Sequence, residues 1–355
     1  MLNLNDREWK AFFICDIFSL ESTSSGIDGN KLSEEQGDIP YLTRTDLNNG
    51  YKFFVGKQAE KYTRDSGNCI TIGLDTQTSF YQPHSFYTGQ NIQVLKNDKL
   101  NKYNAKFFIP LLHNAMVSLN WGGNGATLGR LKKKKIVAPI TDEGKPDYAF
   151  MEQYIRERED KLKQKYINFI GNNHQIKGVL TNFQNKVWAT FKVVDLFDYK
   201  RGNQNNMNSL ADGNDMLISA KNINNGLKGF YTSTNYKKGT YKGNCITLNN
   251  DGDGGIGLAY YQPYKFLLDT HVYALYPKEN VSSFVMLYLS QMLSKQRVCF
   301  SHGYSISQDR LKAMKIMLPT TDDGRPNYEY MEQYTKALMF KKYKKYLEYQ
   351  NCLTP

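Results

Sequence analysis

The sequence predicts an α+β protein in which one folding unit is used twice and each copy ends in an amphipathic helix. The leading observation is a repeated segment: TDEGKPDYAFMEQY at 141–154 returns as TDDGRPNYEYMEQY at 321–334, with nine of fourteen positions identical. The shift of 180 residues is close to half of the 355-residue chain. Chance does not produce such identity in a chain of this length, so the sequence indicates a duplicated unit.

Each copy opens with the same aromatic pattern, Trp-x-x-Phe-x-x-x-Asp-x-Phe, at 9–18 and 188–197. The pattern predicts a short strand that runs into a turn, with the aromatic side chains inside. Residues 20–40 and 199–217 follow; they bear no likeness to each other, and both are polar and rich in Gly, Asn and Ser. This composition predicts loops.

Strand and turn signals then recur in the same order in both copies. Asn-Asn-Gly between β-forming residues predicts a tight turn, GNCIT predicts a buried strand, and Tyr-Gln-Pro comes after it. The candidate strands are 42–46 and 218–222, 67–71 and 243–247, 91–95 and 271–275, and 136–140 and 316–318.

Helical spacing of apolar residues appears twice in each copy. Residues 104–119 and 281–298 predict one pair of helices. The repeated segment predicts the other pair, because Asp147 and Asn327 are good N-cap residues. The first of these helices is expected from Tyr148 to Ile170, with the Gly-Asn-Asn at 171–173 suited to end it.

The matched segments are interrupted by loops that do not match. Residues 121–127 and 301–307 are unlike each other, although both lead into an Arg-Leu-Lys triplet, at 130–132 and 310–312. Loops on a rigid scaffold commonly carry recognition. One scaffold with two sets of loops therefore indicates two related but different targets, and neutral drift of the loops is the alternative.

Composition favours an anionic partner. The net charge is +12 and the pI about 9.2, which favours nucleic acid first and an acidic membrane surface second. A purely solubilising role for the charge remains open. There is no stretch of eighteen apolar residues and no apolar signal core, and the five cysteines form no C-x-x-C. We therefore expect a cytoplasmic protein that spans no membrane.

No pattern in the chain argues for a catalytic or metal-binding residue. The five histidines have no ligand spacing, and no Ser/His/Asp or Cys/His arrangement is indicated. Pro146-Asp147 with Glu159-Asp160-Lys161 fits a nuclease spacing by letters, but Glu159 lies far along the predicted helix from Asp147. We predict that the chain is not an enzyme and holds no cofactor or metal of its own.

Taken in order and in duplicate, these motifs resemble the specificity subunit of Type I restriction–modification systems. The closest resemblance is to compact specificity subunits that also serve Type IIB-like enzymes, and it covers nearly the whole chain. The resemblance implies target-recognition domains at 1–146 and 173–326, each reading one half of a bipartite DNA sequence. Spacer helices at 147–172 and 327–355 would follow them and pack antiparallel.

The resemblance also implies the partners. Separate modification subunits, which carry the methyltransferase and its S-adenosylmethionine, dock on such a subunit, and a restriction subunit can join them. The spacer helices here are short, so we expect a short gap between half-sites. A single-stranded RNA-binding repeat protein and a Mg²⁺-dependent nuclease are the alternatives.

We expect the DNA contacts to come from polar side chains of the unmatched loops and their borders. Arg130 and Arg310 occupy equivalent positions, so they are expected to hold phosphate, because unlike targets should not share a base contact. The predicted DNA-binding residues are Thr43, Arg44, Gln82, Asn124, Thr127 and Arg130 in the first copy, and Ser219, Lys221, Asn222, Tyr304, Ser307 and Arg310 in the second.

Overall fold

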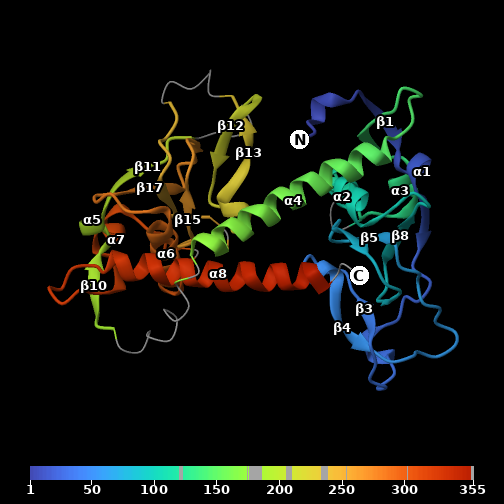
Figure 1. Ribbon diagram of the computed structural model, residues 1–355, viewed down its shortest axis with the longest axis horizontal. Coiled ribbons are helices and arrows are strands. Elements are labelled where there is room, and N and C mark those ends of the chain that lie inside the picture. The colour runs from blue at the N-terminus through green and yellow to red at the C-terminus, as the bar shows by residue number, and fades with distance from the viewer. Residues whose placement is uncertain are drawn as a thin grey trace. The chain divides into compact units, whose positions relative to one another are not determined.

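The structure is a computed structural model that describes residues 1–119, 123–173, 175, 186–204, 210–232, 239–252, 254–301 and 303–352. The chain divides into two compact units, Met1–Gln164 and Lys165–Pro355, and Figure 1 shows the elements of each. Trp121, His174 and His302 lie outside the described residues.

Unit 1 combines short strands with three short or medium helices and the first part of a long one. Its strands are β1 Trp9–Phe13, β2 Ser19–Ser22, β3 Ile39–Leu42, β4 Tyr51–Val55, β5 Cys69–Gly73, β6 Ser79–Gln82, β7 Tyr87–Thr88, β8 Ile92–Lys96 and β9 Lys135–Pro139. Its helices are α1 Ile14–Ile17, α2 Lys102–Met116, α3 Leu128–Lys132 and α4 Tyr148–Asn172, of which the last turns belong to unit 2.

Unit 2 repeats this order of elements. Its strands are β10 Trp188–Lys192, β11 Phe197–Arg201, β12 Asp212–Ile218, β13 Leu227–Tyr231, β14 Cys245–Asn249, β15 Ala259–Gln262, β16 Leu267–Leu268, β17 Val272–Pro277 and β18 Lys315–Pro319. Its helices are α5 Val193–Leu196, α6 Ser283–Ser294, α7 Gln308–Ala313 and α8 Tyr328–Cys352.

The sheets confirm that one folding unit is used twice. Unit 1 contains a four-stranded sheet in the order β2-β8-β5-β6, a three-stranded sheet β4-β3-β7 and the pair β1-β9. Unit 2 contains β11-β17-β14-β15, β13-β12-β16 and β10-β18, which is the same arrangement element for element. The central strands β5 and β14, which carry the GNCIT motif, are buried at all five positions.

Two predictions about strands were wrong. Residues 20–40 and 199–217 are not only loops, because they contain parts of β2, β3, β11 and β12. The strand β2 lies at a sheet edge and three of its four side chains are exposed, so its sequence carries no apolar alternation. The candidate strands at 42–46 and 218–222 are also misplaced: β3 and β12 end at Leu42 and Ile218, and the polar residues beyond them form loops.

The long helices begin as the sequence predicts. Asp147 Oδ1 accepts from the Phe150 amide at 2.9 Å, and Asn327 Oδ1 accepts from the Tyr330 amide at 2.9 Å. One turn further, Met151 and Met331 are fully buried in the cores of their units. The start of each helix is therefore part of the domain that precedes it.

A second matched contact fastens each long helix to its domain. Glu152 Oε2 accepts from Asn101 Nδ2 at 2.7 Å, and Glu332 Oε2 accepts from Ser282 Oγ at 2.6 Å. Asn101 and Ser282 are the N-cap residues of α2 and α6. We call this contact the helix latch; it explains why the glutamate is identical in both copies of the repeated segment.

Within unit 2, the last turns of α4 pack on α8 through aromatic rings. Tyr166 stacks on Tyr343 with ring centroids 4.0 Å apart and meets Tyr346 edge-on at 5.3 Å. Phe169, later on α4, meets Tyr343, which is earlier on α8 than Tyr346. This order of contacts is antiparallel. Tyr166 and Tyr346 are 180 residues apart, so they are equivalent positions of the repeat in contact with each other.

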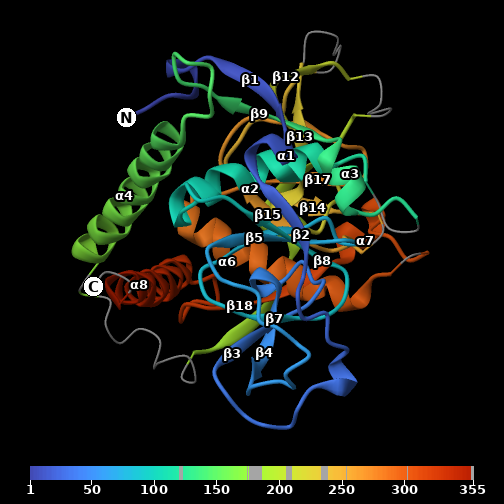
Figure 2. The ribbon, with the colours of Figure 1, turned by 90° about the vertical axis from the view of Figure 1, so that its right-hand side faces the viewer.

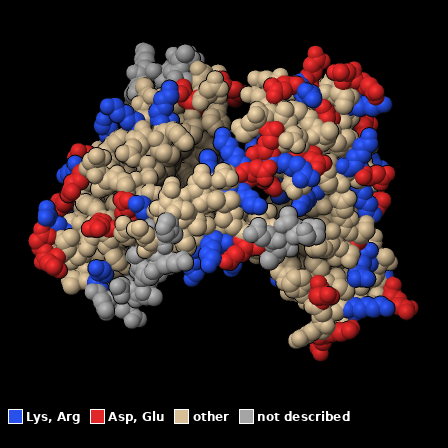
Figure 3. All heavy atoms as spheres, in the orientation of Figure 1, with Lys and Arg blue, Asp and Glu red and all other residues tan. Residues whose placement is uncertain are grey.

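Basic and acidic side chains are interspersed on both units over the face shown in Figure 3. Figure 2 shows the same ribbon after a quarter turn. Across the described part of the chain, no helix is long and apolar enough to cross a membrane.

Candidate nucleic-acid interface

Three loops of unit 1 meet at one end of the domain, and we call their surface loop face 1. They are 43–50 between β3 and β4, 74–78 between β5 and β6, and 123–127 before α3. The Ala126 amide donates to the Leu74 carbonyl at 2.8 Å, and Thr78 Oγ1 donates to the Thr45 carbonyl at 3.3 Å. The Leu74 amide in turn donates to the Asn91 carbonyl at 3.0 Å.

Unit 2 builds loop face 2 in the same way from loops 219–226, 250–252 with 254–258, and 303–307. The Ile306 amide donates to the Asn250 carbonyl at 2.8 Å, as Ala126 does to Leu74. The Asn250 amide donates to the His271 carbonyl at 2.9 Å. The equivalent hydrogen bonds show that loops of unlike sequence are held on one framework.

A buried glutamine in each unit holds the Asn-Asn-Gly turn of the loop face from the interior of the domain. Gln82 is only 5% exposed, and its Nε2 donates to the Asn49 carbonyl and to Thr71 Oγ1, both at 3.0 Å. Gln262 makes the same bonds to Asn225, at 2.9 Å, and Thr247, at 3.0 Å. The structure places Gln82, one of the predicted DNA-binding residues, inside the domain with its Nε2 bonded to the loop above it.

The Asn-Asn-Gly turns are held in a conformation that few residues adopt. Asn48, Asn49 and Gly50 have φ of 50°, 58° and 80°, and the equivalent turn at 224–226 has 50°, 52° and 79°. Asparagine and glycine tolerate this left-handed region better than other residues. Together with the glutamine, the turn fixes the direction in which the preceding loop residues project.

Arg44 is the exposed cation of loop face 1. Its guanidinium forms an ion pair with Asp75 of the neighbouring loop, and Thr43 beside it is half-buried. A forked donor at a loop tip is the side chain best suited to a guanine edge in the major groove. Asp75 was not predicted as a site residue; it holds the Arg44 fork in place.

The other predicted residues of unit 1 support the loop before α3. Asn124 Nδ2 donates to the Ser118 carbonyl at 2.9 Å, and Thr127 caps α3. Arg130 donates to the carbonyls of Gly125 and Gly123 at 3.1 and 2.7 Å. The guanidinium of Arg130 therefore holds its own loop, and the half-buried side chain remains at the loop surface.

In unit 2 the predicted residues divide between two loops. Ser219 is buried, Lys221 is half-buried, and Asn222 is exposed. Lys221 holds the loop through its backbone, since its carbonyl accepts from Asn249 Nδ2 at 3.1 Å. Lys221 lines a shallow hollow together with residues of both charges that were not predicted: Lys228, His271, Asp251 and Asp269.

The loop before α7 combines an aromatic ring with an arginine. The Arg310 guanidinium carbon lies 3.8 Å from the ring centre of Tyr304, which is 48% exposed. Arg310 also donates to the Ser305 carbonyl at 2.6 Å, and Ser307 caps α7. Arg130 and Arg310 thus both bond a carbonyl of their own loop. In the described part of the unit 1 loop, residues 123–127, no aromatic side chain accompanies the arginine.

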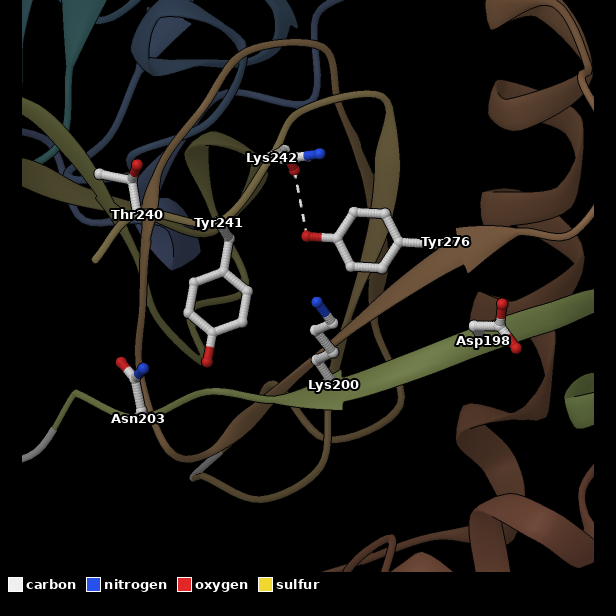
Figure 4. A pocket seen from close by; sticks show the side chains of 7 residues that line it. All are labelled: Asp198, Lys200, Asn203, Thr240, Tyr241, Lys242 and Tyr276. Carbon is white, nitrogen blue, oxygen red and sulfur yellow. Dashed lines mark hydrogen bonds between the residues drawn. The ribbon is translucent and has the colours of Figure 1, made fainter. Parts of the chain in front are cut away.

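A hollow beside β11 distinguishes unit 2 and was also missed by the sequence analysis. Figure 4 shows Lys200 extending toward the rings of Tyr241 and Tyr276, with Tyr276 Oη bonded to the Lys242 carbonyl at 3.2 Å. Among the described residues, neither Lys200 nor Lys242 has an ion-pair partner. The equivalent wall of unit 1 carries Glu21 and Lys96, which pair at 2.7 Å. The alignment that continues from the repeated motif ending at Phe18 and Phe197 places Lys200 at the position of Glu21, and the registers of β2 and β11 agree with it.

Four of the five cysteines are described with their side chains, and they fall into a buried pair and an exposed pair. Cys69 and Cys245 are buried and free, and burial raises the pKa of each thiol to about 12. Cys15 and Cys299 are exposed and free. Within the described ranges, no group of His, Cys, Asp and Glu side chains could hold a metal ion.

The duplicated α+β unit with unlike loop faces defines a protein class: a tandem recognition protein that presents two different binding surfaces on one scaffold. The family model described as "Type I restriction modification DNA specificity domain" matches residues 6–168 and 185–348. The chain belongs to this family, and it is a DNA-recognising specificity subunit of a restriction–modification system, a non-catalytic role. This assignment decides between duplex DNA and the two alternatives left open by the sequence.

A curated relative supports the assignment. The chain is 31% identical over 332 residues to the Type II restriction enzyme BgcI specificity subunit S.BcgI of Heyndrickxia coagulans, covering 92% of this chain and 93% of the relative. Solved structures with similarity include the Type I system S subunit from M. genitalium, with 14% identity, 99% and 95% coverage and a TM-score of 0.40. The HsdS subunit from Thermoanaerobacter tengcongensis has 11% identity, 98% and 92% coverage and a TM-score of 0.33.

Proposed function

We propose that the chain recognises a bipartite double-stranded DNA sequence, with loop face 1 reading one half-site and loop face 2 the other. The observation that carries the proposal is that equivalent buried residues hold loops of unlike sequence in the two units. Gln82 and Gln262 make the same bonds, whereas the exposed tips carry Arg44 in one unit and Tyr304 in the other. The same buried hydrogen bonds beneath different exposed side chains are what we expect if one kind of domain reads two different DNA sequences.

The proposal includes the domain limits and partners. The recognition domains would occupy 1–146 and 173–326, and the helices at 147–172 and 327–355 would act as the spacer. Modification subunits with their S-adenosylmethionine would dock on this chain and methylate adenine, and a restriction subunit would join in a Type I assembly. Because the target is chromosomal DNA, we expect a cytoplasmic protein.

The length of the helices supports a separation suited to DNA. Each long helix has 25 residues, about 38 Å at 1.5 Å per residue, and one turn of B-DNA is about 34 Å. Inserting one helical turn into α4 should change the gap between half-sites and leave the half-site sequences unchanged. A changed half-site with an unchanged gap would contradict the spacer role.

The decisive experiment is methylome sequencing of cells with and without this chain. We expect a bipartite methyladenine motif that disappears on deletion and returns on complementation. Complementation with an Arg44→Ala chain should return the motif with degeneracy confined to one half. If deletion removes no methylated motif, the proposed function is wrong.

A further inference from the structure

A histidine outside the predicted DNA-binding residues lies in the hollow of loop face 2. His271 belongs to the short turn between β16 and β17, residues 269–271, and its side chain is 53% exposed. The same hollow is lined by Lys221 and Asp251, which come from two of the loops that build loop face 2. His271 therefore lies among the residues that the proposed function brings to DNA.

A buried carboxylate holds the imidazole of His271 in one orientation. Asp269 Oδ1 lies 2.9 Å from His271 Nδ1, and the same oxygen accepts from the His271 amide at 3.0 Å. The Asp269 side chain is only 9% exposed, and its own backbone amide donates to the Ile218 carbonyl at 3.0 Å. The ring and the backbone of His271 are therefore both tied to a fixed point of the domain.

This contact also assigns the roles of the two ring nitrogens. A carboxylate only accepts hydrogen bonds, so Nδ1 carries the proton that His271 shares with Asp269. In the neutral imidazole Nε2 is then an acceptor, and it has no hydrogen-bond partner among the residues that the structure describes. An oriented acceptor on an exposed ring is suited to the amino group of a base, which is N6 in adenine and N4 in cytosine.

The charges around the hollow favour a base edge over a phosphate. Lys221 and Lys228 line it together with two carboxylates, Asp251 and Asp269. The carboxylates would repel a phosphate. A mixture of donors and acceptors instead matches the major groove, where each base pair presents both kinds of group.

Unit 1 has different residues at the equivalent positions. Shifted by 180 residues, Asp269 corresponds to Gly89 and His271 to Asn91. Glycine offers no carboxylate, so the side chain of Asn91 cannot be held as that of His271 is. The two turns therefore differ in the way expected of positions that read unlike half-sites.

We propose that His271 reads one base of the half-site bound by unit 2, with Nε2 accepting from the exocyclic amino group of that base, and that Asp269 is its positioning residue. The inference rests on the proposed function, because it takes loop face 2 as a DNA-reading surface. His271 lies outside the three loops that build this face, so it is a reading position in addition to them.

The test uses the full chain with the modification subunit of its own system, and the target found by methylome sequencing. Titration with every single-base variant of the target should show that His271→Ala loses about tenfold discrimination at one position, the effect of about one hydrogen bond. That position should lie in the half-site that Arg44→Ala leaves unchanged. His84→Ala is the matched control, because His84 is an exposed histidine outside the loops of loop face 1, and it should alter no position.

Base analogues test the chemical group that is read. Replacing the amino group of the identified base with hydrogen should weaken binding of the unaltered chain about tenfold. The same replacement should weaken binding of the His271→Ala chain no further, because the two changes remove one contact. Losses that add would show that His271 does not contact the amino group.

Two substitutions test the positioning role of Asp269. Asp269→Asn retains an Oδ1 acceptor and should keep discrimination within about threefold, whereas Asp269→Ala releases the ring and should lose about as much as His271→Ala. Adding His271→Ala to Asp269→Ala should cost little more. If Asp269→Ala unfolds at a lower temperature, Asp269→Asn and the exposed His271→Ala still decide the proposal.

Three results overturn the inference. Equal weakening of all sequences by His271→Ala would make the residue a phosphate contact. Relaxation in the half-site that depends on Arg44 would assign His271 to the wrong half of the target. Unchanged discrimination would show that His271 reads no base. The absence of a methylated motif in cells contradicts the proposed function instead, so the two failures are distinguishable.

Discussion

Each loop face depends on one buried amide. Gln82 and Gln262 each join the turn of one hairpin to the central strand of the neighbouring sheet. The repeated Tyr-Gln-Pro contained a signal that favoured this role, because a residue shared by both copies should not read unlike bases. A residue that is the same in both copies is therefore expected to hold the fold, and a residue that differs between them is expected to read DNA bases.

Gln82→Leu should destabilise unit 1 by about 1–3 kcal/mol, because the Asn49 carbonyl and Thr71 hydroxyl lose a buried donor. Chemical denaturation measures the loss, and Gln262→Leu is the matched variant in unit 2. A Gln82→Leu protein that is fully stable but has altered half-site preference would show that Gln82 contacts DNA after all.

The two arginines of unit 1 should have separable effects. Arg44→Ala removes an exposed fork and should relax one half-site by about 1–3 kcal/mol of discrimination. Arg130→Ala should weaken binding to all sequences alike and lower the salt slope by about one. Binding to a panel of single-base variants at several salt concentrations measures both, and Asp75→Asn tests whether the ion pair positions Arg44. Identical behaviour of the two arginine variants would refute the division of roles.

Thiol chemistry offers an independent test of the cores. Because burial raises the pKa of Cys69 and Cys245 to about 12, almost no thiolate forms there at pH 8. Brief alkylation of the native protein should label Cys15 and Cys299 and spare Cys69 and Cys245, whereas denaturant should make the two buried residues reactive as well. Mass spectrometry of the peptides reads the result, and rapid native labelling of Cys69 would contradict the buried strand.

At the scale of elements, the helix latch fixes the direction in which each long helix leaves its domain. Glu152 and Glu332 bond the N-cap residues of α2 and α6, while Met151 and Met331 anchor the same turns in the cores. Sequence periodicity predicted the helices and their caps. It could not predict the latch, because the partners are about 50 residues away and differ in type, Asn101 in one unit and Ser282 in the other.

Glu152→Ala with Glu332→Ala should loosen the orientation of the helices and broaden the range of accepted gap lengths. We expect discrimination against a gap changed by one base pair to fall about tenfold. This is roughly the free energy contributed by one charge-assisted hydrogen bond. Methylation of DNA substrates with graded gaps measures it, and the half-site sequences serve as the internal control. An unchanged gap profile would show that the latch does not set the separation.

The latch in unit 2 should also weaken in acid. Hydrogen bonds from Lys336 and Ser282 lower the pKa of Glu332 below its ordinary 4.5. Its contribution is therefore present above the ordinary value and is lost as the pH falls through the lowered one. The difference in thermal stability between the native chain and Glu332→Gln should shrink over that range.

Over the whole molecule, the two units have the same strand order, but they carry different charged side chains at equivalent positions. Lys200 and Lys242 line a hollow in unit 2, where unit 1 has the Glu21–Lys96 pair. The sequence predicted the repeat, both cores and both long helices. It did not predict this asymmetry, because the partners of these side chains, Lys96 for Glu21 and the hollow for Lys200, come from elsewhere in the chain and appear only in the structure.

Lys200→Ala with Lys242→Ala should lower the salt slope of DNA binding by about two, if each ammonium neutralises one phosphate. Lys96→Ala should leave the slope unchanged, because its ammonium is already paired with Glu21. Footprinting should show the lost protection only at the half-site bound by unit 2. Equal loss on both sides would contradict the asymmetry.

The buried glutamine has a consequence for how such a molecule acquires new preferences. Positions 44–46 lead into a turn whose backbone is fixed by Gln82 and by left-handed asparagines. Thr45 helps to hold that turn, because its Oγ1 accepts from the Leu47 amide at 3.2 Å. A library randomised at codons 44 and 46 should therefore yield mostly folded members with altered selectivity, whereas one randomised at codon 82 should yield mostly destabilised protein.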